Sequence, residues 1–265
     1  MITVNGKEIN QGRFPDGTLN LRMEDVKTNG FITVEWFYEN DSELFTLMCL
    51  KDYLDRVYRD NDIDLYVPYL PHARMDRVKK REDVFTLKTF CNAINAMKFH
   101  SVIVRDVHSN VSLALLNNVV NIGVGYCIDK AAELSGAEVM FYPDEGAMKR
   151  YSESADKPYA FGVKKRDWST GKILGLDLIN GDLVKGKDIL IVDDICSRGG
   201  TFYHSAKALK EAGANKIYLY VSHLETTVFN GDLINSGLVE KIYTTKSIFP
   251  KDKQSDMIQI LGRDY

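Results

Sequence analysis

The stretch ILIVDDICSRGGTF, residues 189–202, constrains the possible fold more than any other part of the chain. Four aliphatic residues in succession predict a strand buried on both faces, and Asp193 and Asp194 follow at its end. A loop then leads into a helical pattern at 201–212, and a second strand-like run occupies 216–223. This order of strand, loop, helix and strand predicts a βαβ unit with parallel strands and a right-handed crossover.

The same rhythm runs along most of the chain. Short runs rich in β-branched and aromatic residues predict strands at 31–37, 64–70, 101–107, 138–143, 188–194 and 216–223. Apolar residues at helical spacing predict helices at 42–59, 85–97, 126–136 and 201–212. In the last helix, Phe202, Ala206 and Leu209 share a face and Gly213 supplies the stop. The sequence therefore predicts the α/β class.

Length predicts more than one domain. A chain of 265 residues exceeds the usual size of a single domain, so two α/β domains are expected, with a seam near residue 120. The N-terminal domain should comprise 1–120 and the C-terminal domain 121–246. We expect the final segment, 247–265, to return to the N-terminal domain.

Composition excludes several classes of protein. The formal net charge of −3 and the pI of 6.0 give no basic field for nucleic acid or anionic lipid. The start MITVNGKEIN lacks a signal peptide, and no stretch approaches the roughly 18 apolar residues of a membrane span, so a cytoplasmic protein is expected. The four cysteines (Cys49, Cys91, Cys127 and Cys196) are scattered, with none in a C-x-x-C pair, and three lie within apolar runs. This pattern favours small buried side chains over a disulfide or zinc site.

The loop at 196–201 has the chemistry of a phosphate site. A phosphate monoester needs several N–H donors, and Gly199 and Gly200 let the backbone approach closely while the helix N-terminus adds favourable partial charge. Asp193 and Asp194 are acceptors, which suits ribose hydroxyls rather than phosphate. The residues alone are equally consistent with a tight turn beside two solvated acids.

The aliphatic run, the two acids and the Gly-Thr pair resemble the phosphoribosyl-pyrophosphate motif of type I phosphoribosyltransferase folds. Other segments resemble, in the same order, motifs of the ribose-phosphate pyrophosphokinases: PYLPHARMDR at 68–77, VRDVHSN at 104–110, FYPDEGAMKR at 141–150, VKKRD at 163–167, SHLETT at 222–227 and TTKSIFP at 244–250. The resemblance implies two phosphoribosyltransferase-like domains, each a mostly parallel sheet flanked by helices. The first would bind ATP and the second a ribose phosphate.

The resemblance also implies roles for individual residues. The implied ATP-binding residues are Phe14, Asp16, Arg74, Asp76 and His108. The implied catalytic residues are His108, Lys164, Arg166, Asp193 and Asp194, with Lys164 and Arg166 on a mobile loop that continues through Trp168 to Gly171. The implied ribose-phosphate-binding residues are Asp144, Asp193, Asp194, Ser197, Arg198, Gly199, Gly200 and Thr201. Mg²⁺ is the implied cofactor, and its residues would be Asp106, His108 and Asp144.

Asp106 and His108 are two residues apart beside a predicted strand. Because alternate residues of a strand share a face, we expect both side chains to point to one metal or phosphate. Taken alone, such a pair at a strand end more often has a structural role. The guanidinium of Arg74 suits phosphate oxygens, although an ion pair with Asp76 would explain it as well.

The implied reaction transfers the β,γ-diphosphoryl group of MgATP to the anomeric hydroxyl of ribose 5-phosphate. Its products would be AMP and phosphoribosyl pyrophosphate, a precursor in nucleotide biosynthesis. The resemblance further implies a homo-oligomer, a dimer or larger.

Two segments depart from the family pattern. In GRFPDGT, which begins at residue 12, Thr18 stands where the family carries Glu. In the phosphate loop, Ser197 and Arg198 replace an Asp and a Thr, which makes the site more positive by roughly two charges. Extra positive charge suits a 5-substituted ribose that carries a diphosphate. ADP-ribose is therefore an alternative acceptor, which would give ADP-ribose pyrophosphate and a role in NAD metabolism.

Two further functions stay open. A phosphoribosyltransferase shares the stretch at 189–202 but needs no separate ATP-binding half. A catalytically silent regulatory homologue would assemble with an active enzyme, and the retention of His108, Asp144, Lys164 and Arg166 argues against it.

Overall fold

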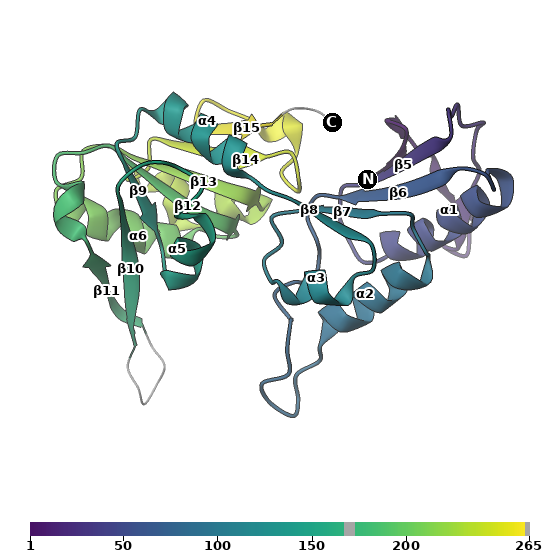
Figure 1. Cartoon of the computed structure of the whole chain (residues 1–265), viewed down its shortest axis with the longest axis horizontal. Coiled ribbons are helices and arrows are strands. Elements are labelled where there is room, and N and C mark those ends of the chain that lie inside the picture. The colour runs from purple at the N-terminus through teal and green to yellow at the C-terminus, as the bar shows by residue number, and fades with distance from the viewer. Residues whose placement is uncertain (167–172, 263–265) are drawn as a thin grey trace. The chain divides into compact units, whose positions relative to one another are not determined.

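Strands and helices alternate in both halves of the chain in the computed structural model. The structure describes residues 1–166 and 173–262, apart from the side chains of 164–166 and 173–175. The chain divides into two units, Met1–Ile122 and Gly123–Tyr265, close to the expected seam (Figure 1). The predicted α/β class is confirmed, since each unit has a mostly parallel sheet flanked by helices.

Unit 1 contains a six-stranded sheet in the order β2-β1-β5-β6-β7-β8. These strands are β1 (Ile2–Val4), β2 (Lys7–Glu8), β5 (Phe31–Trp36), β6 (Asp62–Val67), β7 (Val102–Arg105) and β8 (Val119–Ile122). Strands β5 to β8 run parallel, whereas β1 is antiparallel to both neighbours. A separate hairpin comprises β3 (Gln11–Arg13) and β4 (Leu19–Leu21). The helices are α1 (Glu43–Val57), α2 (Thr86–Ala96) and α3 (Val111–Leu115).

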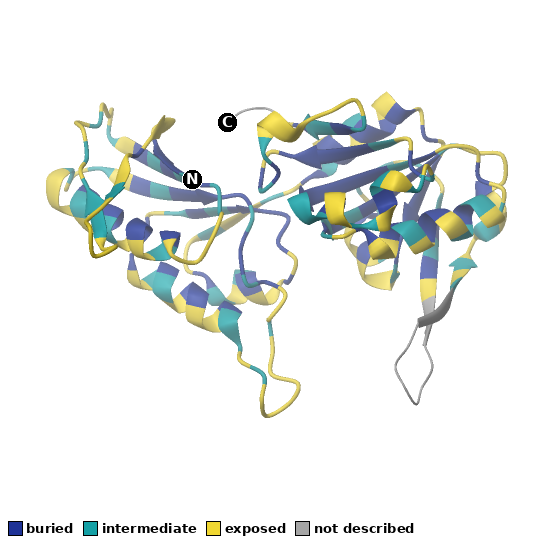
Figure 2. Ribbon diagram, turned by 180° about the vertical axis from the view of Figure 1, so that it is seen from behind, coloured by how far each residue is buried: buried dark blue, intermediate teal, exposed yellow. Residues whose placement is uncertain are grey.

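One face of this sheet carries the core of unit 1. Along β5, Ile32, Val34 and Trp36 are buried while the residues between them are only partly buried, which is the two-residue period of a strand with one apolar face. Helix α1 contributes Leu47 and Leu50 to the same core. Both α1 and α2 lie on one side of the strands in Figure 1, and Figure 2 shows that each has a buried and an exposed side.

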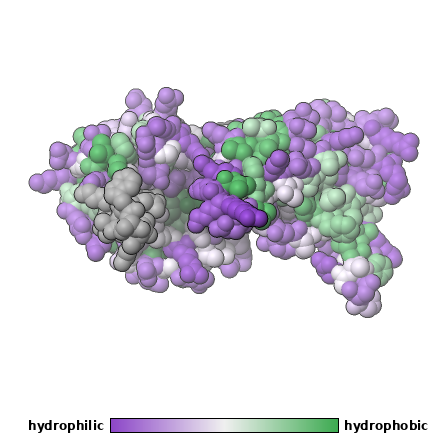
Figure 3. All heavy atoms as spheres, turned by 90° about the horizontal axis from the view of Figure 1, so that it is seen from below, coloured by the Kyte–Doolittle hydropathy of each residue, from purple (hydrophilic) through white to green (hydrophobic). Residues whose placement is uncertain are grey.

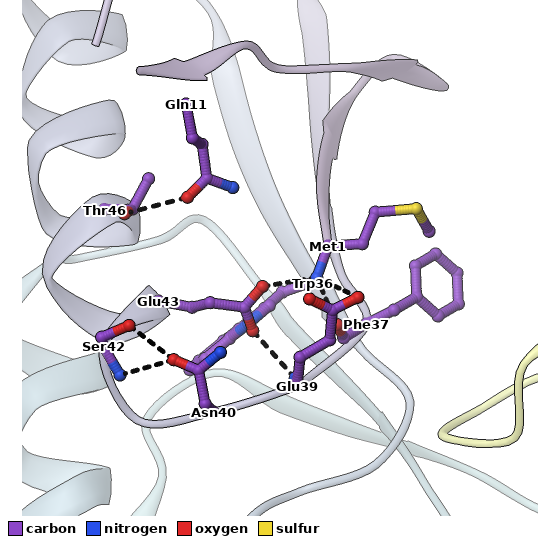
Figure 4. A network of polar contacts seen from close by, with 9 residues as sticks. All are labelled: Met1, Gln11, Trp36, Phe37, Glu39, Asn40, Ser42, Glu43 and Thr46. Atoms are coloured by element: carbon purple, nitrogen blue, oxygen red, sulfur yellow. Dashed lines mark hydrogen bonds and ion pairs between the residues drawn. The ribbon is translucent and has the colours of Figure 1, made fainter. Parts of the chain in front are cut away.

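The first turn of α1 is tied to the sheet by the buried carboxylate of Glu43 (Figure 4). Its Oε2 accepts hydrogen bonds from the Trp36 indole Nε1–H and the Glu39 backbone N–H, both at 2.9 Å. The amino group of Met1 donates to Glu43 Oε1 and, at 2.9 Å, to the Phe37 carbonyl oxygen. A carboxylate is buried at low cost only where donors and a cation surround it, and Glu43 has both.

We expect Glu43→Ala to lower the free energy of unfolding of unit 1 by about 1–3 kcal/mol, because the buried indole N–H of Trp36 loses its acceptor. Trp36 fluorescence during urea denaturation measures this change in a Trp168→Phe background, since the chain has 2 tryptophans. The control is Glu39→Ala, which removes an exposed side chain and keeps the backbone donor. Equal destabilisation by both variants would contradict the role given to the Glu43 carboxylate.

His100 precedes β7 and lies beside two carboxylates of β6. Its Nδ1 is 2.9 Å from Asp64 Oδ1, and its Nε2 is 3.8 Å from Asp62 Oδ2. The hydrogen bond with Asp64, followed by the charge of Asp62, raises the pKa of His100 above its ordinary 6.5. Protonated His100 therefore stabilises the folded protein below pH 6.5, and this contribution is lost as the pH rises through the raised folded-state pKa.

His100→Gln is expected to lower the Tm at about pH 5.5 and to leave it unchanged at about pH 9, where the imidazole is neutral in both the folded and unfolded states. Thermal unfolding of the wild type and the variant across this range measures the difference. Asp64→Asn removes the main partner of the imidazolium and should reduce the pH dependence. A Tm difference of the same size at both pH values would refute the pairing.

Unit 2 contains a seven-stranded sheet in the order β11-β10-β9-β12-β13-β14-β15. These strands are β9 (Val139–Tyr142), β10 (Tyr159–Arg166), β11 (Ile173–Ile179), β12 (Ile189–Cys196), β13 (Ile217–Leu224), β14 (Lys241–Thr245) and β15 (Ile258–Leu261). Among the described residues of this sheet, only the β10–β11 pair is antiparallel. The helices are α4 (Gly125–Ser135), α5 (Glu145–Tyr151), α6 (Gly200–Glu211) and α7 (Asp232–Asn235), with short 3-10 turns at Gly181–Val184, Thr226–Asn230 and Lys251–Lys253.

Apolar clusters cover both faces of this sheet. Along β12, Ile189 and Ile191 belong to the cluster that contains α6, whereas Leu190 and Val192 belong to the cluster that contains α4 and α5. A parallel strand buried on both faces reads as a continuous apolar run, which is what the sequence shows here. The helical face predicted for α6 is confirmed, since its buried residues include Phe202, Ala206 and Leu209.

The C-terminal segment belongs to unit 2, which corrects the expectation that residues 247–265 return to the N-terminal domain. Strand β15 pairs in parallel with β14, with Ile258 opposite Ile242, and forms the edge of the second sheet. Ile258 and Leu261 are buried there. A short apolar run does not specify which sheet edge it joins, because tertiary packing selects its partner.

Side-chain exposure follows the usual pattern of a folded chain. As predicted, Cys91, Cys127 and Cys196 are buried, and Cys49 is partly buried. Figure 3 shows hydrophilic side chains over most of one face, with apolar side chains gathered in smaller patches. None of the helices in residues 1–166 and 173–262 has the length and apolar character to cross a membrane.

Candidate active site

Two loops of unit 1 lie side by side at the carboxyl ends of β6 and β7. They are the segments 68–77 and 106–110, for which the family resemblance implies binding of ATP and metal. They are neighbours because β6 and β7 are adjacent parallel strands, whose carboxyl ends meet at one edge of the sheet. The Ser109 hydroxyl links the two loops directly by donating to Asp76 Oδ2 at 2.7 Å.

Asp76 is held in place by its neighbours. Arg77 donates from Nε and Nη2 to the two carboxylate oxygens at 2.7 and 2.9 Å. The hydrogen bond from Arg77, with that from Ser109, lowers the pKa of Asp76 to about 2. Asp76 therefore fixes the loop as an anion across the physiological pH range, and the exposed Arg74 lies on the same loop. The arrangement gives Asp76 a role in shaping this loop.

Asp106 and His108 do not share the face of a strand, so that expectation was wrong. β7 ends at Arg105, and Asp106 has a left-handed backbone with φ 42°. The chain turns at this point, so the alternation of a strand no longer applies. Asp106 is buried, with its N–H donating to the Ile122 carbonyl at 3.3 Å, whereas His108 is exposed. Aspartate tolerates this conformation better than most residues, and such backbone strain is concentrated at functional sites.

Phe14 and Asp16 lie on the β3–β4 hairpin. Asp16 Oδ1 accepts hydrogen bonds from the Thr18 backbone N–H at 3.0 Å and the Thr18 hydroxyl at 2.7 Å, and these bonds lower the pKa of Asp16. Thr18, the residue that departs from the family pattern, therefore closes the turn with Asp16. The Phe14 ring is 50% exposed and available for contacts outside the hairpin. The hairpin contacts α1, where the Thr46 hydroxyl donates to Gln11 Oε1 at 3.3 Å.

In unit 2, three acids lie near the carboxyl ends of the adjacent parallel strands β9 and β12. Asp144 follows β9 and caps α5, its Oδ1 accepting from the Ala147 N–H at 3.1 Å. Asp193 is partly buried, and its Oδ1 accepts from the Asp194 N–H at 2.9 Å. Asp194 is buried, and its Oδ2 accepts from Arg150 Nη1 at 2.9 Å. The structure thus brings the segments at 141–150 and 189–202 together.

The loop after β12 has the geometry of an anion site. Gly199 has φ 79°, and a Cβ built on it would lie 2.8 Å from Leu233 Cβ, so glycine is required there. Helix α6 begins at Gly200, and both Gly200 and Thr201 are exposed. The first N–H groups of a helix have no intrahelical acceptor and favour an anion.

A hydroxyl chain connects this loop to a carboxylate that the sequence analysis did not single out. Ser197 Oγ lies 3.1 Å from Thr227 Oγ1, and the Thr227 hydroxyl donates to Glu225 Oε2 at 3.1 Å. The Glu225 N–H donates to the Cys196 carbonyl at 2.8 Å. Glu225 places a negative charge near the loop, which offsets part of the positive charge inferred from Ser197 and Arg198. Its signal in the sequence was the SHLETT segment, residues 222–227.

Segments 222–227 and 244–250 meet in a buried polar cluster. The Ser222 carbonyl accepts from Thr245 Oγ1 at 2.7 Å and from Ser247 Oγ at 3.0 Å. Ser247 Oγ also lies 2.9 Å from His223 Nδ1, and His223 is 1% exposed. These groups tie the ends of the adjacent strands β13 and β14 together and so support the loop beside them.

Lys164 and Arg166 lie on the backbone of β10, which pairs with β11 in an antiparallel hairpin. Lys164 is opposite Leu176, and the register shifts between Lys165 and Arg166. The side chains of Lys164 and Arg166 lie outside the description, as do residues 168–171 of the predicted mobile loop.

The metal residues implied by the resemblance come from both units. Asp106 and His108 belong to unit 1, and Asp144 belongs to unit 2. Within the part of the chain that the structure describes, no three His, Cys, Asp or Glu side chains form a group that could hold a metal ion.

Unit 2 has the architecture of a phosphoribosyltransferase domain, with two acids near the end of a central parallel strand and a glycine turn that opens the next helix. The profile of the phosphoribosyl transferase domain matches residues 149–248. The whole fold is similar to that of a phosphoribosylpyrophosphate synthetase from Mycobacterium smegmatis, with a TM-score of 0.75 and 18% identity over 96% of this chain and 85% of that one. The fold is therefore of the phosphoribosyltransferase class.

Sequence similarity identifies the family within this class. A ribose-phosphate pyrophosphokinase of Sulfurisphaera tokodaii is 32% identical over 248 residues, which cover 90% of this chain and 84% of the relative. Another, of Caldanaerobacter subterraneus subsp. tengcongensis, is 29% identical over 264 residues, which cover 94% of this chain and 81% of the relative. The chain belongs to the ribose-phosphate pyrophosphokinase family and is a transferase of the diphosphokinase type.

Gly231 packs against the backbone of the phosphate loop, since a Cβ built on it would lie 1.8 Å from the Arg198 carbonyl oxygen. We expect Gly231→Ala to displace the loop and to lower the free energy of unfolding of unit 2 by at least about 1–3 kcal/mol, the usual cost of overpacking. Chemical denaturation followed by circular dichroism measures the loss. Gly125→Ala is the matched control, because a Cβ there meets nothing within 4 Å. Equal stability of the two variants would contradict the close packing.

Proposed function

We propose that the chain transfers the β,γ-diphosphoryl group of MgATP to the anomeric hydroxyl of ribose 5-phosphate, giving phosphoribosyl pyrophosphate and AMP. The observation that carries this proposal is the position of Asp193 and Asp194 near the end of β12, just ahead of the glycine turn that opens α6. Hydroxyl-binding acceptors and phosphate-binding N–H donors at one strand end suit a sugar phosphate. Membership of the family supports the same reaction.

The residues of unit 2 would bind the acceptor. Asp193 and Asp194 would orient the ribose through its hydroxyls, with Asp144 beside them. The 5-phosphate would be held by the N–H groups of the loop from Ser197 to Thr201 and by the N-terminal end of α6. Such alignment of the anomeric oxygen supplies a large part of the rate acceleration in phosphoryl-type transfer.

The residues of unit 1 would bind ATP. Arg74 and His108 would contact the triphosphate, on loops joined by Asp76, while Phe14 and Asp16 of the hairpin would contact the adenosine. The anomeric oxygen forms a bond to the β-phosphorus as the bond between that phosphorus and the α,β-bridging oxygen breaks. AMP leaves, and the hydroxyl proton passes to solvent. Lys164 and Arg166 would neutralise the charge that develops on the phosphates, so no nucleophilic side chain is needed.

Mg²⁺ suits the donors that the chain offers. This ion prefers oxygen ligands and is commonly held by one or two carboxylates together with waters and substrate phosphates, so a full protein cage is unnecessary. Asp106 and Asp144 are carboxylates of this kind, and His108 would lie beside the phosphates. When bound, the ion would neutralise phosphate charge.

We further propose that the chain forms a homo-oligomer.

A second acceptor is favoured by the residues of the phosphate loop. Arg198 is an exposed cation on this loop, where a second phosphate group of a 5-substituted ribose would be attracted. ADP-ribose is such a compound and would yield ADP-ribose pyrophosphate. Glu225 reduces the positive charge near Ser197, which supports ribose 5-phosphate as the first candidate.

Incubation of the purified protein with ATP, Mg²⁺ and either acceptor tests both candidates, with products identified by mass spectrometry. We expect phosphoribosyl pyrophosphate and AMP from ribose 5-phosphate. Exclusive use of ADP-ribose would establish the second candidate instead. Consumption of phosphoribosyl pyrophosphate with a base, without release of AMP from ATP, would indicate a phosphoribosyltransferase.

Restoring the family residues should shift acceptor preference. Ser197→Asp combined with Arg198→Thr is expected to lower kcat/KM for ADP-ribose relative to ribose 5-phosphate by about tenfold or more, because a charge-assisted contact to the second phosphate is lost. Competition between the two acceptors in one reaction measures this ratio. Lys207→Thr removes an exposed cation of α6 and is the control. An unchanged ratio in the double variant would exclude a role of the loop charge in acceptor choice.

A further inference from the structure

Arg150 and Asp194 form an ion pair between α5 and β12. Arg150 Nη1 lies 2.9 Å from Asp194 Oδ2, and the side chains are 30% and 9% exposed. The guanidinium also lies over the Tyr151 ring, 5.8 Å from its centroid. Arg150 is thus a partly buried cation with its charge directed at one of the two acids of the phosphate-loop strand.

Burial makes this partner important to Asp194. A carboxylate that is nearly excluded from water is costly unless a cation or hydrogen-bond donors compensate it. Its neighbour Asp193 is partly buried and accepts the Asp194 backbone N–H at 2.9 Å. Asp194 receives a full positive charge from another element, which favours its ionised form and restrains its orientation.

Helix α5 links two parts of the acceptor site through this pair. Asp144 begins the helix by capping it, and Arg150 lies in its last turn. The position of Asp144 is thereby coupled to that of Asp194 by one short helix. A residue that anchors α5 to β12 therefore influences both acids.

We propose that Arg150 is a positioning residue that keeps the buried Asp194 carboxylate ionised and in one orientation, and so aligns the acceptor sugar. This inference rests on the proposed function, in which Asp194 orients the ribose. Arg150 acts through Asp194 and α5, and loss of the guanidinium affects the acceptor rather than ATP.

The test compares Arg150→Gln with Lys149→Gln. Both variants remove one positive charge from the last turn of α5, but Lys149 pairs with Glu145 on the surface, where the side chains are 68% and 65% exposed. We expect Arg150→Gln to lower kcat/KM for the acceptor by about ten- to a hundredfold, by analogy with the loss of a side chain that orients a metal-binding residue. The KM for ATP should stay within about twofold of the wild type, and Lys149→Gln should leave both parameters unchanged.

Arg150→Lys distinguishes positioning from a purely structural role. Because the lysine ammonium keeps the positive charge, we expect Arg150→Lys to restore a large part of the acceptor kcat/KM that Arg150→Gln loses. The recovery is incomplete because lysine lacks the guanidinium fork. A structural role would instead change the ATP and acceptor parameters together, in step with a lower Tm. That result, or equal activity of Arg150→Gln and Lys149→Gln, would overturn the inference. Should Arg150→Gln fail to fold, the comparison of Arg150→Lys with the wild type retains the acceptor-specific readout.

A double-mutant cycle with Asp194→Asn completes the experiment. If Arg150 acts through Asp194, Arg150→Gln has little further effect on acceptor kcat/KM in the Asp194→Asn background. Full additivity of the two changes would contradict this. The same variants separate this inference from the proposed function. Wild-type activity of Asp194→Asn would contradict the role of Asp194 in binding the acceptor and so count against the proposed function. An inactive Asp194→Asn together with a fully active Arg150→Gln would contradict only the role given to Arg150.

Discussion

Parallel pairing brings the carboxyl ends of neighbouring strands to one edge of a sheet, and the candidate site depends on this constraint in both units. In unit 2, Asp144 follows β9, and the acid pair lies near the end of the adjacent β12. In unit 1, the loop with Arg74 follows β6, and Asp106 follows the adjacent β7. In each unit, segments far apart in the chain therefore contribute to one edge, and apolar clusters pack against the strands that carry them.

Carboxylates at these edges are compensated within their own unit. Asp76 is held by Arg77 and Ser109, and Asp194 is held by Arg150. The hydrogen bond from Arg77 lowers the pKa of Asp76, and Arg150 places a positive charge beside the buried Asp194, since removing charge from water without a partner is costly. The acids can therefore shape a site for hydroxyls and phosphates while the fold tolerates their burial.

The two departures from the family pattern have local physical explanations. Thr18 stands where the family has a glutamate, and it closes the hairpin turn with Asp16 through its backbone N–H and its hydroxyl. Ser197 is connected through Thr227 to Glu225, which supplies negative charge near the position where the family has an aspartate. Local charge at the loop is thus set by two segments, one of which the motif alone does not include.

The sequence by itself determined the α/β class, the principal strands and helices, and the strand, acid pair and glycine turn at 189–202, because these depend on local apolar period and on backbone conformations that glycine permits. Only the tertiary structure decided that β15 joins the second sheet, and that Asp106 turns the chain instead of continuing a strand. It also decided that Arg150 pairs with Asp194 of β12, and that Thr227 links Ser197 of the phosphate loop to Glu225. Each of these depends on a partner distant in the sequence. Packing and long-range hydrogen bonds select such partners, and no local pattern records them.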